Sequence, residues 1–509
     1  FSYAKNKLVC LTKPNGKQIR YEYDTIGRLK RKYSVNEGDK KKHFDYRISY
    51  NKNDEIIQVL NDGHPETLTR VFDLSGQVKK EQIKDCFTSS YEYDLNNHCT
   101  KVTLPDQSAI SYAYADGQLK AIHRIKDNKT LYSHHYTRYD QAGNIAQEEA
   151  PGAGMSQSYT RDTMGRLASF TSQSKSWSIA EGSYDAVGNL HRASLTDAVG
   201  TLDQNFSYDI YNHLQKESGT INSQYTYNSR HNRLKKDQNA HSHNNLDQLI
   251  NDGKSQFRYD ANGNLIQKTQ SGKTQNFHYD ALGRMIYFED GETACEYFYD
   301  FFNRRFKTIS YKCNPDHSRT LSKKTLYLWH GDHEIATINE EGKIDKLRVL
   351  GKALLPSQEM AVAIEIADKT YIPSHDYRGS VASLQDLESG QTVESYRYSA
   401  FGEEQVYNSD AEPTKDSTIG NPWRYSSKPK DSASGLIYFH HRFYLPEIGR
   451  WTVQDPAGSI DGPNLYAYVL NNPLCYHDPY GLSCLTRSLG IAVGAGHAGK
   501  DAVCGIGSL

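Results

Sequence analysis

Two Asp-Pro steps lie near the C-terminal end of the sequence, at Asp455 and Asp478, with an Asn-Pro turn between them. Hydrolysis of a peptide bond by carboxyl groups needs one carboxylate to activate water and one carboxylic acid to protonate the carbonyl. Two carboxyl groups a few ångströms apart meet this need by sharing a proton, because both cannot ionise together. The two aspartates are therefore a candidate catalytic pair, but each one alone is more typical of an ordinary turn.

Other candidates for chemistry are weaker. His440 and His441 are neighbours on an expected strand and would point to opposite faces, which disfavours a shared metal ion. Residues 494–500 (GAGHAGK) have the spacing of a phosphate-binding loop, but Asp501 stands where the magnesium-binding Ser or Thr belongs. No Gly-x-Ser-x-Gly, His-Glu-x-x-His or Cys/His dyad is present. We therefore expect no cofactor and no metal.

The elements that position the aspartates are dominated by one repeat. It reads aromatic, any residue, Tyr-Asp, two residues, Gly or Asn, Arg/Asn/Gln, and then Leu, Val or Ile. Clear copies are residues 21–29 (YEYDTIGRL), 257–265 (FRYDANGNL) and 277–285 (FHYDALGRM). Weaker copies centre on Tyr50, Phe72, Tyr93, Tyr114, Tyr139, Tyr159, Tyr184, Tyr208, Tyr227 and Tyr299, mostly about 19 to 25 residues apart.

Each repeat predicts a β-hairpin. The two aromatic residues alternate with period two, which places both rings on one face of a strand. The Asp side chain can accept hydrogen bonds from backbone N–H groups just ahead and so begins a turn. Gly or Asn supplies the position with positive φ, and the following Leu opens the return strand. No unit can bury its aromatic face alone, so neighbours must stack into a long, coiling antiparallel sheet. The fold class is all-β.

Composition agrees with this architecture. The 509-residue chain is only 37% hydrophobic, with a mean hydropathy of −0.76, yet it contains 38 Tyr and 16 Phe. Disordered chains are poor in aromatic residues, so the composition indicates thin sheets rather than disorder. The formal net charge of −1 favours neither nucleic acid nor an anionic membrane as a partner. No apolar run is long enough for a membrane-spanning helix.

The regular spacing stops after residue 304. Residues 314–324 and 407–421 are polar; the first is interpreted as a loop and the second as a loop or an inserted linker. A series of short motifs then resembles the Rhs repeat-associated core, which occurs in bacterial polymorphic toxins and in the C subunits of insecticidal toxin complexes. The same repeats occur in the animal teneurins. In order, the motifs are residues 376–381 (DYRGSV), 396–402 (YRYSAFG), 435–444 (GLIYFHHRFY), 449–451 (GRW), 455–456 (DP), 462–468 (GPNLYAY), 472–473 (NP) and 478–482 (DPYGL).

The resemblance implies a shell of spiralling strands that encloses a C-terminal toxin segment and cuts itself. The implied cut falls after the Asp-Pro-x-Gly-Leu motif, between Leu482 and Ser483. Asp455 and Asp478 match the family's aspartyl pair, and Arg442 matches its arginine. A buried guanidinium would hold one carboxylate ionised; the alternative is that it pairs with an ordinary core carboxylate. Leu445 departs from the family pattern, which commonly has Asp there.

Two further carboxylates lie near the pair. Asp461 and Glu447 are interpreted as solvent-facing loop residues. Asp461 is the best substitute if either member of the pair fails.

The expected organisation is a repeat shell over residues 1–305, a core with the autoprotease motif over 325–482, and a short C-terminal segment over 483–509. The last segment is too short for an enzyme domain, so no toxin activity is assigned. The sequence opens without Met or a secretory signal, and we expect its true N-terminus to lie outside it.

The leading hypothesis is a toxin-encapsulating shell, exported from a bacterium, that releases its C-terminal segment. Its expected partners are that segment and a secretion-system spike or toxin-complex protein. Two alternatives remain open: a non-enzymatic surface or adhesion scaffold, and glycan binding by the Tyr-rich sheet.

Overall fold

The chain forms strands along almost its whole length, as the sequence predicts. The computed structural model describes residues 1–35, 43–64, 66–150, 152, 155–173, 175–354 and 360–486. Within these ranges the helical elements are single 3-10 turns, η1 (Tyr425–Ser427), η2 (Ser459–Asp461) and η3 (Val469–Asn471). None of the helical turns in these ranges approaches the length or apolar character needed to cross a membrane.

Two large sheets form the wall of the molecule, and within each of them every strand pairs antiparallel with the next strand along the chain. The first sheet consists of β1 (Ser2–Ala4), β2 (Lys7–Thr12), β3 (Gln18–Tyr23), β4 (Leu29–Val35), β5 (Asp45–Tyr50), β6 (Ile56–Asn61), β7 (Glu66–Phe72), β8 (Val78–Ile83), β9 (Phe87–Tyr93), β10 (Cys99–Thr103), β11 (Ala109–Ala115), β12 (Gln118–Lys126), β13 (Lys129–Tyr139), β14 (Ile145–Glu149), β15 (Ser156–Arg161), β16 (Leu167–Thr171), β17 (Ser176–Ser178), β18 (Arg192–Asp197), β19 (Gly200–Tyr208), β20 (Leu214–Gly219), β21 (Ser223–Tyr227), β22 (Arg233–Lys236) and β23 (Asn239–Ala240).

A second sheet continues the same pattern. It consists of β24 (Ser242–His243), β25 (Leu249–Asn251), β26 (Ser255–Tyr259), β27 (Leu265–Gln270), β28 (Lys273–Tyr279), β29 (Met285–Glu289), β30 (Thr293–Tyr299), β31 (Arg305–Cys313), β32 (Arg319–His330), β33 (His333–Ile338), β34 (Ile344–Leu350), β35 (Ala361–Ile366), β36 (Lys369–His375), β37 (Val381–Asp386), β38 (Thr392–Tyr398), β39 (Glu404–Tyr407) and β40 (Pro413–Thr414). Two small sheets follow, formed by β41 (Ile437–Tyr438), β42 (Phe443–Leu445) and β43 (Arg450–Trp451), and by β44 (Tyr476–His477) and β45 (Leu485–Thr486).

The repeat forms its turn as predicted. In the first clear copy, Asp24 Oδ1 accepts the backbone N–H groups of Ile26 at 3.1 Å and Arg28 at 2.8 Å. Gly27 lies between them with φ of +95°, in the left-handed region that costs glycine little. The Arg28 guanidinium then binds the other oxygen of Asp24 at 2.8 Å. One aspartate therefore organises both the backbone and the side chains of the turn.

The tyrosine that precedes the first turn residue links neighbouring repeats; that turn residue is an Asp in most repeats but Asn228 after Tyr227 and Ser399 after Tyr398. The tyrosine hydroxyl donates a hydrogen bond to the backbone carbonyl of a Leu, Val or Met at or near the start of the return segment of the preceding unit. Such bonds join Tyr23 to Leu8 (2.9 Å), Tyr50 to Leu29 (2.8 Å), Tyr93 to Val78 (3.0 Å), Tyr208 to Leu190 (2.7 Å), Tyr227 to Leu214 (2.9 Å), Tyr299 to Met285 (2.8 Å) and Tyr398 to Val381 (2.7 Å). These tyrosines are thus structural parts of the wall.

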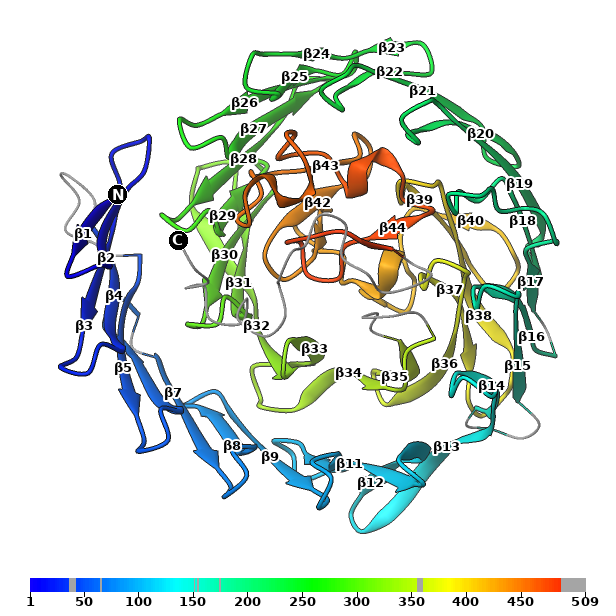
Figure 1. Cartoon of the computed structure of the whole chain (residues 1–509), viewed down its shortest axis with the longest axis horizontal. Coiled ribbons are helices and arrows are strands. Elements are labelled where there is room, and N and C mark those ends of the chain that lie inside the picture. Colours follow the sequence, from blue (N-terminus) through cyan, green and yellow to red (C-terminus); the bar gives the residue numbers. More distant parts are fainter. Residues whose placement is uncertain are drawn as a thin grey trace.

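The wall winds into a spiral (Figure 1). Strands β1–β23 form an outer turn, and strands β24–β40 pass inward to form an inner turn that lies against it. Polar contacts join the two turns at Lys17–Tyr279, Tyr46–Tyr299, Glu66–Lys307, Glu81–Arg304, Tyr91–Trp329, Arg124–Glu365, Tyr136–Lys352, Trp177–His375, Asp197–Arg397, Glu217–Ala400 and Lys236–Glu403. Lys17 and Tyr279, at the first contact, are 262 residues apart in the sequence, whereas Lys236 and Glu403, at the last contact, are 167 residues apart. The inner turn therefore covers the same set of contacts with fewer residues than the outer turn and is the shorter of the two.

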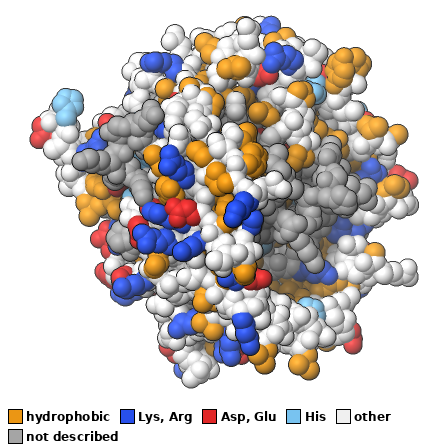
Figure 2. All heavy atoms as spheres, turned by 60° about the vertical axis from the view of Figure 1, so that its left-hand side comes forward, with side chains coloured by type: hydrophobic (Ala, Val, Ile, Leu, Met, Phe, Trp, Pro, Cys, Tyr) orange, Lys and Arg blue, Asp and Glu red, His pale blue; other side chains and the backbone are white. Residues whose placement is uncertain are grey.

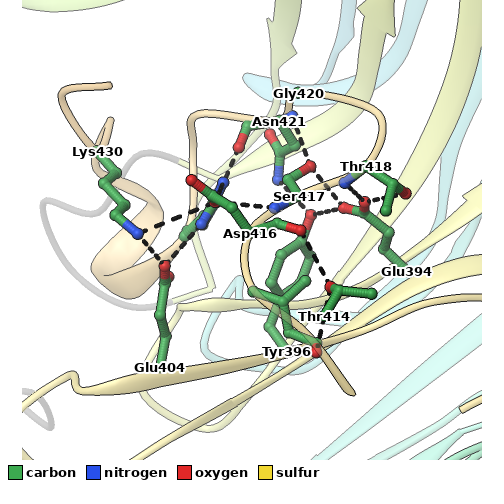
Figure 3. Close-up of polar contacts among 12 residues, drawn as sticks. Glu394, Tyr396, Glu404, Thr414, Asp416, Ser417, Thr418, Gly420, Asn421 and Lys430 are labelled. Atoms are coloured by element: carbon green, nitrogen blue, oxygen red, sulfur yellow. Dashed lines mark hydrogen bonds and ion pairs between the residues drawn. The ribbon is translucent and has the colours of Figure 1, made fainter. Parts of the chain in front are cut away.

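Residues 415–486 lie in the middle of the spiral, shown in orange and red in Figure 1. A buried carboxylate on the inner turn holds the segment that leads from the wall into the middle of the spiral (Figure 3). Glu394 on β38 accepts hydrogen bonds from the hydroxyls of Ser417 and Thr418 at 2.7 Å each and from Tyr396 at 2.5 Å. Backbone N–H groups of Thr418 and Ile419 bind the same side chain. The chain is thereby held to the wall before it turns inward.

Both polar segments interpreted as loops are more ordered than the sequence suggested. Residues 314–318 make a turn, but Arg319–Lys324 belong to β32 and pair with β31. Within 407–421, Pro413 and Thr414 form β40, and residues 417–419 bind Glu394. The loop interpretation was wrong here because a strand at an exposed edge of a sheet can be polar on both faces, and its sequence then shows no alternation of apolar and polar residues.

No single sign of charge dominates the face of the molecule shown in Figure 2. Lys and Arg side chains are interspersed there with Asp, Glu and hydrophobic ones. This distribution agrees with the formal net charge of −1.

The tyrosine link can be tested at Tyr299, which is 6% exposed. Tyr299→Phe keeps the ring and leaves the Met285 carbonyl without this donor, so we expect a loss of about 1 kcal/mol in the free energy of unfolding. The control is Tyr407→Phe, whose hydroxyl binds Gln405 at the exposed end of β39, with an expected change below about 0.5 kcal/mol. Urea unfolding followed by tryptophan fluorescence measures both; equal losses would contradict a special role for the link.

Candidate functional site

The three residues predicted as a catalytic set lie together in the middle of the spiral. Arg442 directly precedes β42, and its guanidinium lies 4.1 Å from the ring centre of Trp451 on β43. Its Nη2 contacts Asp455 Oδ2 at 2.7 Å and Asp478 Oδ2 at 3.1 Å. Because one nitrogen binds an oxygen of each carboxyl group, the two groups are close enough for the charge of one to raise the pKa of the other.

The two aspartates differ in how many donors they receive. Asp478 Oδ1 accepts the backbone N–H groups of Tyr480 (3.1 Å), Gly481 (2.7 Å) and Leu482 (3.1 Å). Asp455 Oδ1 accepts one, from Ala457 at 2.8 Å. Hydrogen bonds to a carboxylate favour its ionised form. Of the pair, Asp478 is therefore the better holder of the negative charge and Asp455 the better holder of the shared proton.

Burial acts on both carboxyl groups. It raises the pKa of Asp455 to about 7; the Arg442 guanidinium opposes the shift, and the nearby Asp478 and Asp461 carboxylates add to it. Burial also raises the pKa of Asp478 from its ordinary value, against the opposing effect of Arg442 and of the three backbone N–H groups. A proton can therefore reside on the pair near neutral pH.

The expected cleavage residues follow this cluster directly. Arg442 Nε donates to the backbone oxygen of Gly481 at 2.6 Å, and Leu482 N–H binds Asp478 as described above. Gly481 has φ of +73°, and a Cβ there would lie 3.1 to 3.3 Å from atoms of Phe439 and Arg442. The turn before the Leu482–Ser483 bond thus passes so close to the arginine that only glycine fits without displacement.

The chain beyond that bond is also held. Leu485 and Thr486 form β45, which pairs with β44 in the register His477–Leu485 and Tyr476–Thr486. The side chain of Cys484 is 1% exposed. The Leu482–Ser483 bond therefore lies in a short loop anchored on both sides.

A small cavity adjoins the cluster. Asp455, Asp461 and Asp478 line it together with Trp451, and His231 from the outer turn closes one side. His231 occupies a repeat turn at the position usually taken by Gly or Asn and has φ of +60°. The site is thus completed by the wall.

Asp461 is not the solvent-facing residue that the sequence suggested. Its Oδ2 accepts the backbone N–H of Cys484 at 2.7 Å, and burial raises its pKa to about 6. The interpretation was wrong because the turn η2 points Asp461 back toward Asp455. The sequence contained one signal, namely that Asp461 follows Asp455 by six residues in the same loop. Glu447 is exposed, as predicted, and pairs with Lys268 at 2.7 Å.

The two histidines do not point to opposite faces of a strand. Their rings stack with centroids 4.4 Å apart, because His440 has φ of +68° and interrupts the extended backbone. Leu445 is buried on β42, and Arg442 receives its carboxylates from Asp455 and Asp478 instead. Residues 494–500, with phosphate-loop spacing, lie outside the described residues.

Comparison with known proteins places this geometry in a family. The model of the Teneurin YD-shell family matches residues 153–473. The toxin subunit YenC1 of Yersinia entomophaga is 24% identical over 447 residues, covering 86% of this chain and 37% of YenC1. The tRNA nuclease WapA of Bacillus subtilis is 25% identical over 334 residues, covering 64% of this chain and 11% of WapA. The chain thus spans about a third or less of the length of these relatives.

Solved structures show the same fold. The crystal structure of TcdB2-TccC3-Cdc42 matches with a TM-score of 0.67 at 18% identity, covering 93% of this chain and 27% of that one. A shorter stretch of 62 residues, 12% of this chain, is 53% identical to the toxin subunit YenC2 of Yersinia entomophaga. With its repeats, its spiral wall and a family match over more than half its length, the chain belongs to the Teneurin YD-shell family, among the Rhs-type repeat proteins.

Proposed function

We propose that this chain is the shell of a toxin-type protein and that it hydrolyses its own Leu482–Ser483 bond. The observation that carries the proposal is the triple contact of Arg442 with Asp455, Asp478 and the Gly481 carbonyl. A single side chain thereby fixes the carboxyl pair against the segment that contains the bond. Self-cleavage of this kind is a single turnover, and the chain is not a catalyst for other substrates.

The roles follow from the donors that each aspartate receives. Water attacks the Leu482 carbonyl carbon and gives its proton to the ionised member of the pair, Asp478. Asp455 gives its proton to the Leu482 carbonyl oxygen, and the proton that Asp478 took from water then passes to the leaving nitrogen of Ser483. When the intermediate collapses, the pair takes one proton back from it. Hydrolysis leaves a carboxylate on Leu482 and an ammonium group on Ser483, so one water molecule is consumed and the pair regains its single proton.

The biological setting extends the same proposal. Relatives that match this chain are named as toxin subunits or toxin proteins, which supports an exported bacterial shell. In this proposal residues 1–305 form the repeat shell, 325–482 the core, and 483–509 the segment that is enclosed and released. A secretion-system spike or a toxin-complex protein is the proposed external partner. No observation specifically favours an adhesion scaffold or a glycan-binding surface.

Intact-mass measurement tests the cut. We expect the purified chain to separate into residues 1–482 and the 27 residues 483–509. Asp455→Asn removes the acid but leaves Asp478 to pair with Arg442, so cleavage should slow by about 100-fold or more while the fold persists. Asp478→Asn should also stop cleavage.

The matched control is Asp410→Asn, an exposed turn residue, which should cut at the rate of the unsubstituted chain. Circular dichroism and limited proteolysis report whether each variant is folded. A folded, unsubstituted chain that stays in one piece would exclude self-cleavage and leave a shell without chemistry.

The pH dependence tests the assignment of the acid. Because the pKa of Asp455 is raised to about 7, its carboxyl keeps its proton up to neutral pH and loses it above. The cleavage rate should therefore fall about tenfold for each pH unit beyond that point. Arg442, Asp478, Asp461 and His231 are the charged or titratable groups around it.

The measurement uses chain refolded from urea at each pH and quenched at intervals for intact mass. Tryptophan fluorescence of Asp455→Asn under the same conditions gives the folding rate separately. A cleavage rate that keeps rising above pH 8 would contradict Asp455 as the acid.

A further inference from the structure

A third carboxylate holds the other side of the bond. Asp461 Oδ2 accepts the N–H of Cys484 at 2.7 Å, and Asp478 Oδ1 accepts the N–H of Leu482 at 3.1 Å. The Leu482–Ser483 peptide lies between these two anchored N–H groups. Both ends of the loop are therefore tied to carboxylates of one cluster.

The contact at Cys484 is buried. The Cys484 side chain is 1% exposed, and β45 begins at the next residue. Asp461 lines the same cavity as Asp455 and Asp478, and its carboxyl interacts electrostatically with Asp478 and with Arg442. Its position relative to the pair is thus set by the same packing that sets the pair.

We propose that Asp461 is a positioning residue for self-cleavage, which fixes the leaving side of the Leu482–Ser483 bond through the Cys484 N–H. This proposal rests on the proposed function. Without the bond to Asp461, the Ser483 nitrogen would move relative to the acid, and a displacement of about 1 Å can cost about 100-fold in rate. Asp461 acts on geometry and supplies no proton.

The second oxygen of Asp461, Oδ1, is not used in this contact. Oδ1 is buried and accepts no hydrogen bond within the described part of the chain. Hydrolysis turns the Ser483 nitrogen, the neighbour of the Cys484 amide along the chain, into an amine that becomes an ammonium ion near neutral pH. The same carboxylate that positions the bond is thus available to retain the new terminus.

Substitutions at Asp461 separate positioning from acid chemistry. Asp461→Ala removes the acceptor for the Cys484 N–H, and we expect cleavage to slow by about tenfold or more. Asp461→Asn keeps an acceptor oxygen without a titrating proton, so it should restore the rate to within about threefold. Ser459→Ala, an exposed residue of the same turn, is the control and should cut normally. Rates come from intact mass during refolding.

Each outcome decides the proposal. Cleavage of Asp461→Ala at the unsubstituted rate would overturn it. Cleavage of Asp461→Asn as slowly as Asp455→Asn would also overturn it, since the carboxyl would then act as an acid or base. A merely structural role would change the melting temperature of Asp461→Ala without rescue of the rate by Asn.

A second measurement does not depend on cleavage. In Asp455→Asn protein, which keeps the loop intact, adding Asp461→Ala should speed hydrogen exchange at the Cys484 amide by about tenfold, while Ser459→Ala should not. Unchanged exchange would overturn the contact itself. If the unsubstituted chain were not cut but this exchange rose as expected, the proposed function would fail while the anchoring contact stood.

Discussion

The hydrogen bond from a repeat tyrosine to the carbonyl of the preceding unit is the interaction on which the wall depends. A meander of hairpins pairs each strand only with its neighbours along the chain. The bond from Tyr50 to Leu29, or from Tyr299 to Met285, joins the return strand of one hairpin to the first strand of the next and so fixes how one unit follows the last. A buried hydroxyl needs a partner, so the ring and its bond are placed together. Phenylalanine could supply the ring but would leave that carbonyl without its donor.

The wall in turn determines where charge can be buried. Arg442 forms ion pairs with two carboxylates in the middle of the spiral, where burial of an unpaired charge would destabilise the fold. It is stacked on Trp451 and bonded to Gly481, so neither carboxylate can move without disturbing the turn before Leu482. His231 brings the outer turn to the edge of the same cavity. The cluster is therefore a property of the wound molecule and not of the last segment alone.

The features that the sequence predicted correctly are those that depend on residues close together in the chain. The period-two aromatics and the Asp turn depend on residues a few positions apart, and Asp24 with Gly27 behaves as that reasoning requires. Pairs such as Asp197 and Arg397, 200 residues apart, depend on the winding and have no local signal. Asp455, Asp478 and Arg442 were found through resemblance of the motif. Asp461 and the stacked His440 and His441 were misjudged because single turn conformations decide their direction.

The concentric arrangement also has a consequence for the order of synthesis. A ribosome completes the outer turn first, the inner turn second and the middle last. Asp455, Asp461 and Asp478 all belong to the final portion, yet the cavity that they line is also lined by His231, made more than 200 residues earlier. The carboxylate cluster is therefore complete only when the residues synthesised last have packed inside the outer turn, which is synthesised first. If the proposed cut is made there, it would register the end of assembly, and a chain stalled halfway through winding would keep residues 483–509 covalently attached.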